Sequence, residues 1–326
     1  MEYNVKGSNK AILFAMFLPQ IISIVFITIL SAFYSDLKEL QNSLVYLLSM
    51  MLVAQIAFAI IIGFFACKNK INVWKSIKTE NKKLTIKNVA VCVVISIVAV
   101  FGLFYFVSLF NKLFGLIGFV PSTAGLPNNT FGWFLINVLI SAILPAVLEE
   151  LVFRGIVFGG LKKHGFWFAC LISSFAFMFV HLSLGSVVYP IIMGVVFCLI
   201  NKKTGSILYS MIVHFCNNFI VLLVEYLSNV LGKSILPDTN LWWQYLLAIL
   251  VAVVAIVIIW CIIKKWLTNK NSDNNLLQDK VICENQTEIE AQTQIVVNKY
   301  EKKSVLYTMM VSFVFWIIMI AISLAG

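Results

Sequence analysis

The amino-acid sequence predicts an all-α fold, a polytopic transmembrane bundle of about nine helices. Of the 326 residues, 61% are hydrophobic and 12% are charged, and the mean hydropathy is +0.97. Soluble domains contain only about 45–50% apolar residues, so this composition does not fit a water-soluble fold. Apolar stretches of about 20 residues, enough for a helix to cross a bilayer core, recur along the chain. The expected spans are residues 11–34, 44–66, 89–110, 131–160, 165–184, 187–201, 204–228, 241–263 and 304–325.

The spans and the segments between them divide the chain into five parts. These are residues 1–130, with three helices and a basic loop at 68–88; residues 131–228, with four closely spaced spans; residues 229–268, with the eighth span; the polar linker 269–303; and residues 304–326, with the ninth span. The linker is rich in Asn, Gln, Glu and Lys, which predicts a largely disordered segment containing a short surface helix at 289–300. No internal repeat of the kind found in many transporters is present.

The basic residues predict the orientation of the chain. The net charge is +10, but the lysines are scattered over the loops, which does not favour a nucleic-acid partner. If the N-terminus is cytoplasmic, every basic residue except Lys38, Lys112 and Lys233 lies on the inner side. The positive-inside rule therefore predicts an integral membrane protein with a cytoplasmic N-terminus. The seven cysteines show no paired spacing, so neither disulfides nor a cysteine metal site is expected.

The adjacent pair Glu149-Glu150 lies inside the fourth span, where a charge is costly. Arg154, the only arginine in the chain, follows Glu150 by four residues, which places the two on one helical face. A planar guanidinium at this one position indicates a bidentate partner, and Glu150 is the expected one. Glu149 points about 140° away and remains the freer carboxylate. An ion pair that only holds two helices together is the alternative interpretation.

Two histidines accompany these carboxylates in other apolar segments. His181 closes the sequence that begins at Phe177, and it is expected well inside the fifth span. His214 and Asn218 share one face of the seventh span. The alternative interpretation is that each of these side chains only forms a hydrogen bond between helices. His164 follows two lysines, and we expect it at an ordinary surface position.

The three sets of residues together resemble a known family. Glu149-Glu150-Leu151-Val152-Phe153-Arg154, Phe177 to His181 and His214 to Asn218 are similar to the ordered motifs EExxxR, FxxxH and HxxxN of the CAAX protease and bacteriocin-processing family, intramembrane peptidases that include the type II CAAX prenyl endopeptidases. The resemblance implies that Glu149 activates water together with His181. It also implies that Glu150 and Arg154 orient Glu149, and that His214 and Asn218 bind the oxyanion. Membrane lipid and a peptide or protein substrate are the implied partners.

Several points stay open at this stage. Members of this family have often been described as metallopeptidases, and a zinc ion would need Glu149, His181 and His214 to converge as three ligands. No HExxH motif is present, so the sequence establishes no cofactor, and we favour a glutamate–histidine site that activates water. The alternatives are a transporter that uses the buried Glu/His cluster as a proton relay and a non-catalytic immunity protein. The almost exclusive use of lysine is typical of an AT-rich bacterial genome. A bacterial cell membrane and a role in bacteriocin processing or immunity are therefore the expectations.

Overall fold

The computed structural model describes residues 4–34, 36–69, 84–120, 125–235, 242–266 and 288–325, most of which are helical. The main helices are α1 (Val5–Ser31), α2 (Leu37–Asn42), α3 (Leu44–Asn69), α5 (Ile86–Gly115), α9 (Phe166–Phe179), α10 (Val188–Thr204), α11 (Ile207–Leu231), α12 (Trp242–Trp266) and α14 (Glu288–Ala325). A continuous helical run from Phe131 to His164 lies between α5 and α9. The predicted all-α polytopic bundle is confirmed.

Eight helical segments of the described residues are long and apolar enough to cross a membrane, one fewer than the nine predicted. The expected fifth span, 165–184, is not among them, because α9 has only 14 residues and a length of about 21 Å. It ends at Phe179, and the chain turns before the short 3₁₀ helix η4 (Leu184–Ser186) leads into α10. The helices α9 and α10 pack against each other and form a short helical hairpin.

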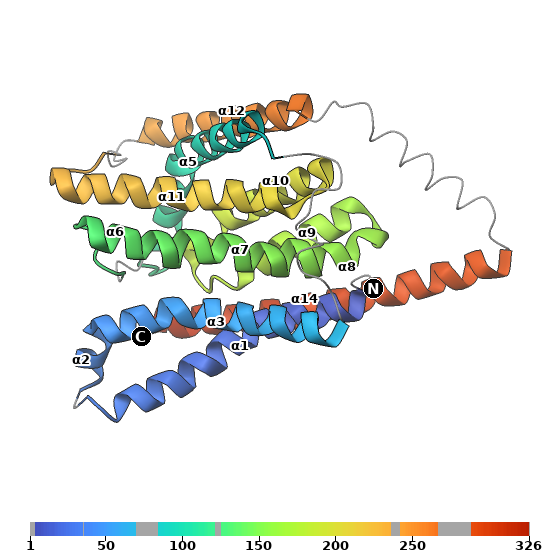
Figure 1. Ribbon diagram of the computed structural model, residues 1–326, viewed down its shortest axis with the longest axis horizontal. Helices are drawn as coiled ribbons and strands as arrows, with labels where there is room; N and C mark the ends of the chain where they lie inside the picture. The colour runs from blue at the N-terminus through green and yellow to red at the C-terminus, as the bar shows by residue number, and fades with distance from the viewer. Residues whose placement is uncertain are drawn as a thin grey trace.

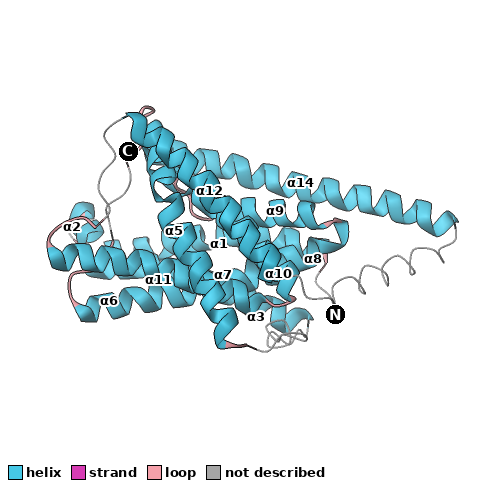
Figure 2. Ribbon diagram, turned by 90° about the horizontal axis from the view of Figure 1, so that it is seen from above, coloured by secondary structure: helices cyan, strands magenta, loops and turns pink. Residues whose placement is uncertain are grey.

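The helices are arranged in layers, and the run 131–164 lies between the two outer layers (Figure 1). The helices α5 and α12 pack together on one outer side, and α1, α3 and α14 form the opposite side. The helix α11 packs on α5 and on the run, so it connects the outer layer with the centre. The two ends of the chain lie at opposite ends of the bundle in Figure 1 and again in Figure 2.

The central run contains two π-helical segments. It consists of α6 (Phe131–Asn137), the π-helix η1 (Val138–Ile143), α7 (Leu144–Glu150), the π-helix η2 (Leu151–Phe158), α8 (Gly159–Leu161) and the 3₁₀ helix η3 (Lys162–His164). Segments of π-helix are rare in proteins, and those that occur are frequently found at functional sites. Here they precede and follow the helix that carries Glu149 and Glu150, so the acidic pair lies between two unusual segments.

Hydroxyl groups of neighbouring helices bind the carbonyls of η2. Ser173 Oγ of α9 donates to the carbonyl of Phe153 at 2.8 Å. Ser8 Oγ of α1 lies 3.2 Å from the carbonyl oxygens of both Ile156 and Val157. Both serines are fully buried, where an unpaired carbonyl would be costly. These contacts fix the run against α1 and α9.

The helix α14 differs from two expectations of the sequence analysis. Residues 289–300 are helical as expected, but this helix is not separate from the ninth span, because α14 continues without interruption from Glu288 to Ala325. The remainder of the expected linker lies outside the described residues, as does most of the basic loop 68–88. His164 is not a surface residue: its side chain is buried, and its Nε2 lies 3.0 Å from Oε2 of Glu301 on α14. The docking of α14 covers a position that the neighbouring lysines indicated as exposed.

Candidate active site

Arg154 and Glu150 form the predicted ion pair at the centre of the bundle. Nη1 of Arg154 lies 2.8 Å from Oε1 of Glu150, and both side chains are fully buried. Nη2 donates to the carbonyl of Gly194 on α10 at 3.4 Å. The guanidinium also lies between two aromatic rings, 4.5 Å from the centroid of Phe177 and 4.8 Å from that of Phe197. One arginine therefore connects the central run with both helices of the short hairpin.

His214 of α11 lies between the two glutamates. Its Nδ1 is 3.1 Å from Oε1 of Glu150, and its Nε2 is 3.8 Å from Oε2 of Glu149. Its ring stacks on Phe197 with a centroid separation of 5.1 Å. Because a carboxylate can only accept hydrogen bonds, Nδ1 carries the proton in the contact with Glu150. Glu150 thereby sets the orientation of the imidazole, and Nε2 faces Glu149.

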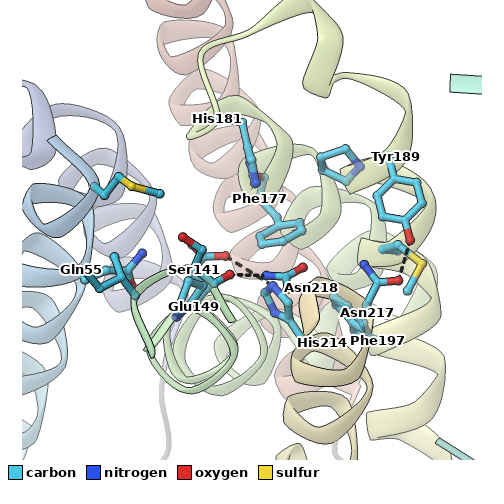
Figure 3. Close-up of a pocket in the computed structure, with 15 residues that line it drawn as sticks. Gln55, Ser141, Glu149, Phe177, His181, Tyr189, Phe197, His214, Asn217 and Asn218 are labelled. Carbon is cyan, nitrogen blue, oxygen red and sulfur yellow. Dashed lines mark hydrogen bonds and ion pairs between the residues drawn. The ribbon is translucent and has the colours of Figure 1, made fainter. Parts of the chain in front are cut away.

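A cavity of about 260 Å³ opens beside Glu149. It lies between the central run, α3, α10 and α11, and Figure 3 shows its labelled side chains. Glu149, His181, His214 and Asn218 all line it. A second cavity of about 210 Å³, lined by residues of α1 and α3, also reaches Glu149 and His181. These two residues therefore border both cavities.

His181 lies just beyond α9, in a turn, and not inside a span as predicted. Its Nδ1 is 2.8 Å from the carbonyl of Phe177, so Nδ1 donates and Nε2 remains available as an acceptor. The next residue, Leu182, has a φ of 45°, in the left-handed region that side chains rarely adopt. The chain thus reverses directly after His181. The imidazole stays exposed at the tip of the hairpin, where it lines both cavities.

Asn218 has a structural partner that the sequence did not reveal. Its Nδ2 donates to the carbonyl of Ser141 at 3.0 Å. Pro145 follows Ser141 by four residues and has no N–H to give to that carbonyl, so the amide of Asn218 supplies a donor that the helix lacks. One N–H of the Asn218 amide is used in this contact, and the second remains for another acceptor.

The structure adds four polar cavity residues to the predicted set. Gln55, Ser141, Tyr189 and Asn217 line the cavity beside the predicted residues. Tyr189 donates through its hydroxyl to Oδ1 of Asn217. Asn217 is next to the predicted Asn218, and a second asparagine in this apolar span could have indicated a further polar residue of the cavity. Gln55 is far away in sequence and was missed, although a glutamine within an apolar span is itself unusual.

Glu149, His181 and His214 are the three residues that a zinc ion would need as ligands. Among the described residues, no group of three or more His, Cys, Asp or Glu side chains is placed to hold a metal ion. Glu149 and His214 form a close pair, and the contacts of Nδ1 of His214 with Glu150 and of Nδ1 of His181 with the carbonyl of Phe177 leave Nε2 of each ring for another partner. No step proposed below is assigned to a metal ion.

Fold and site together define a class: a helical membrane protein with a buried carboxylate–imidazole site between its helices. Residues 131–220 match the family model described as "Type II CAAX prenyl endopeptidase Rce1-like". Residues 131–220 are therefore similar to this family, and the predicted resemblance to the CAAX protease and bacteriocin-processing family is confirmed over that segment. All six predicted site residues lie within it.

A curated relative supports the same assignment. The chain is 35% identical over 89 residues to a protein of Bacillus subtilis (strain 168) named "Putative membrane peptidase YdiL". The match covers 27% of this chain and 36% of the length of that relative. No solved structure matches the chain.

Proposed function

We propose that the chain is an intramembrane endopeptidase that hydrolyses a peptide bond in a membrane-associated peptide or protein. One observation carries the proposal: Glu149 and His181 border the same cavity, with Nε2 of His214 only 3.8 Å from Glu149, inside the segment that matches a peptidase family. Peptide hydrolysis needs a base to activate water and donors for the oxyanion, and this cavity offers both kinds of group.

The proposed reaction begins at Glu149. Its carboxylate accepts a proton from a water molecule in the cavity, and the Nε2 of His181 accepts a hydrogen bond from the same water. The water oxygen attacks the carbonyl carbon, and the proton held by Glu149 then passes to the leaving amine as the C–N bond breaks. Glu149 is suited to this role because Glu150, and not Glu149, is bound by Arg154.

The remaining groups are proposed to support the tetrahedral intermediate. Glu150 orients His214 through Nδ1, and His214 and the second N–H of Asn218 are the proposed donors to the oxyanion. Arg154 holds Glu150 in position through its ion pair. Each is a positioning or donor role, so the loss of one such group is expected to reduce the rate without removing the base.

The test uses the full chain in proteoliposomes with a pool of internally quenched hydrophobic peptides. Wild type is expected to cleave, whereas Glu149→Gln and His181→Ala each lose about 100-fold or more of the rate, because a general base contributes about 10²–10⁴-fold. Glu225→Gln on α11 is the matched control, since this glutamate is exposed and outside the cavity. Cleavage by Glu149→Gln at the wild-type rate would overturn the mechanism.

The same assay decides whether zinc takes part. Cleavage that continues after treatment with a zinc chelator supports water activation by glutamate and histidine. Activity that is lost on chelation and restored by added zinc contradicts it and assigns the water to a metal. Solute flux through the proteoliposomes with no peptide cleavage would instead favour a transporter.

A further inference from the structure

Gln55 presents an unpaired amide oxygen beside the candidate active site. The residue lies on α3, it is 8% exposed, and it lines the cavity that contains Glu149. Its Oε1 has no hydrogen-bond donor among the described residues. Buried polar side chains are almost always bonded, so an unpaired amide oxygen in an apolar span needs an explanation.

Packing alone does not explain a glutamine at this position. Met51, one turn earlier on the same face of α3, lines the same cavity with an apolar side chain of similar length. A second methionine at position 55 would fill comparable space without a polar atom. Burying an amide without a partner costs free energy, so the carboxamide is better explained by a ligand that donates to it.

We propose that Gln55 binds the main chain of the peptide substrate, an inference that rests on the proposed function. Its Oε1 accepts a hydrogen bond from a backbone N–H next to the bond that is cleaved. An extended peptide offers such donors all along its length, so this contact places the substrate without selecting its sequence. Lipid phosphates and carbonyls offer only acceptors, so they do not complement this oxygen.

The position of Gln55 fits a peptide that crosses the cavity. In Figure 3, Gln55 and the Tyr189–Asn217 pair lie on opposite sides of Glu149 and His214. The second cavity continues from Glu149 and His181 toward α1 and α3, which leaves room for the chain on that side. A part of the protein outside residues 131–220 thus completes the binding site for the substrate.

The test compares wild type, Gln55→Met and the matched control Gln41→Met, which makes the same change at an exposed position of α2. With a peptide that wild type cleaves, Gln55→Met is expected to raise KM about fivefold at unchanged kcat, as for the loss of one hydrogen bond. Gln41→Met is expected to leave both constants unchanged. An unchanged KM for Gln55→Met overturns this inference and leaves the proposed function intact.

A second measurement distinguishes binding from a structural role. Without peptide, Gln55→Met is expected to unfold at the same temperature as wild type or higher, because it removes an unpaired buried oxygen. A clear fall in unfolding temperature would show that Gln55 has a structural partner and would overturn the inference. If wild type cleaves no peptide of the pool, the proposed function fails, and the inference fails with it.

Discussion

At the scale of single residues, Arg154 determines how the site is held together. Its guanidinium binds Glu150 and the carbonyl of Gly194, and it lies between the rings of Phe177 and Phe197. A flat cation with donors on several sides suits all four neighbours at once. This geometry explains why the chain uses its only arginine here and lysine at every other basic position.

Arg154→Lys is therefore expected to be disruptive although the charge is kept. A lysine ammonium can pair with Glu150, but it cannot stack between two rings and reach Gly194 together. We expect a loss of about 1–3 kcal/mol in the free energy of unfolding, measured by denaturation of the purified protein in detergent. The control is Lys203→Arg at the exposed end of α10, which should change little. Equal stability of Arg154→Lys and wild type would contradict this account.

The residue-level predictions succeeded where local geometry decides the contact. Glu150 and Arg154 are four residues apart, a spacing that places two side chains on the same face of any helix, so their ion pair was predictable. The burial of His164 and the unpaired oxygen of Gln55 depend on α14 and on the central run, which no local pattern reveals. His181 lines the same cavity as Glu149, but it was assigned to the wrong backbone element, because its apolar neighbours continue the helical pattern past Phe179.

At the scale of helices, Pro145 and Asn218 show how an irregular helix is stabilised inside an apolar layer. Pro145 cannot donate to the carbonyl of Ser141, and Asn218 of α11 does so at 3.0 Å. The HxxxN pattern thus has a structural use beside its proposed role with the oxyanion. The two lengths that sequence reading misjudged, α9 and α14, have one cause: hydropathy locates apolar segments but not the turns and packing that end a helix.

Close packing of α9 and α10 gives a prediction at this scale. A Cβ atom built on Gly194 would lie 2.8 Å from Cβ and 2.9 Å from Cα of Ser174, so the backbones must move apart. Gly194→Ala is expected to cost about 1–3 kcal/mol and to weaken the contact between Arg154 and the carbonyl of residue 194.

The matched control for this change is Gly63→Ala on α3, where the added methyl group meets nothing within 4 Å. Alanine favours the helix over glycine by about 1 kcal/mol, so the control should be neutral or stabilising. Unfolding curves of both variants in detergent provide the comparison. If Gly194→Ala were as stable as Gly63→Ala, the hairpin would not be tightly packed at this point.

At the scale of the whole molecule, the site is shared between two parts of the chain. Residues 131–220 supply the acidic pair, both site histidines and Asn218, whereas Met51 and Gln55 of α3 close the cavity from the other side. The segment that matches the family therefore does not form the whole cavity. This division explains why the family pattern located the polar residues of the central run, α9 and α11 but not the side of the cavity that α3 forms.

The path of the chain also makes a prediction about topology. The hairpin of α9 and α10 begins and returns at the same end of the bundle, so it does not change which side the later helices reach, whether or not its tip crosses the membrane. The chain ends at the opposite side from its start, as both views show. With a cytoplasmic N-terminus, as the positive-inside rule predicts, the C-terminus is then expected outside.

Reporter fusions measure this directly, because fluorescent proteins of the usual kind mature in the cytoplasm and alkaline phosphatase is active only outside it. A fluorescent N-terminal fusion and an active C-terminal phosphatase fusion are the expected pair. Two termini on the same side would mean that a helix outside the hairpin fails to cross. Termini on opposite sides of the membrane, with the N-terminus outside, would agree with this fold but contradict the orientation inferred from the lysines. The loops that carry most of the lysines would then lie outside.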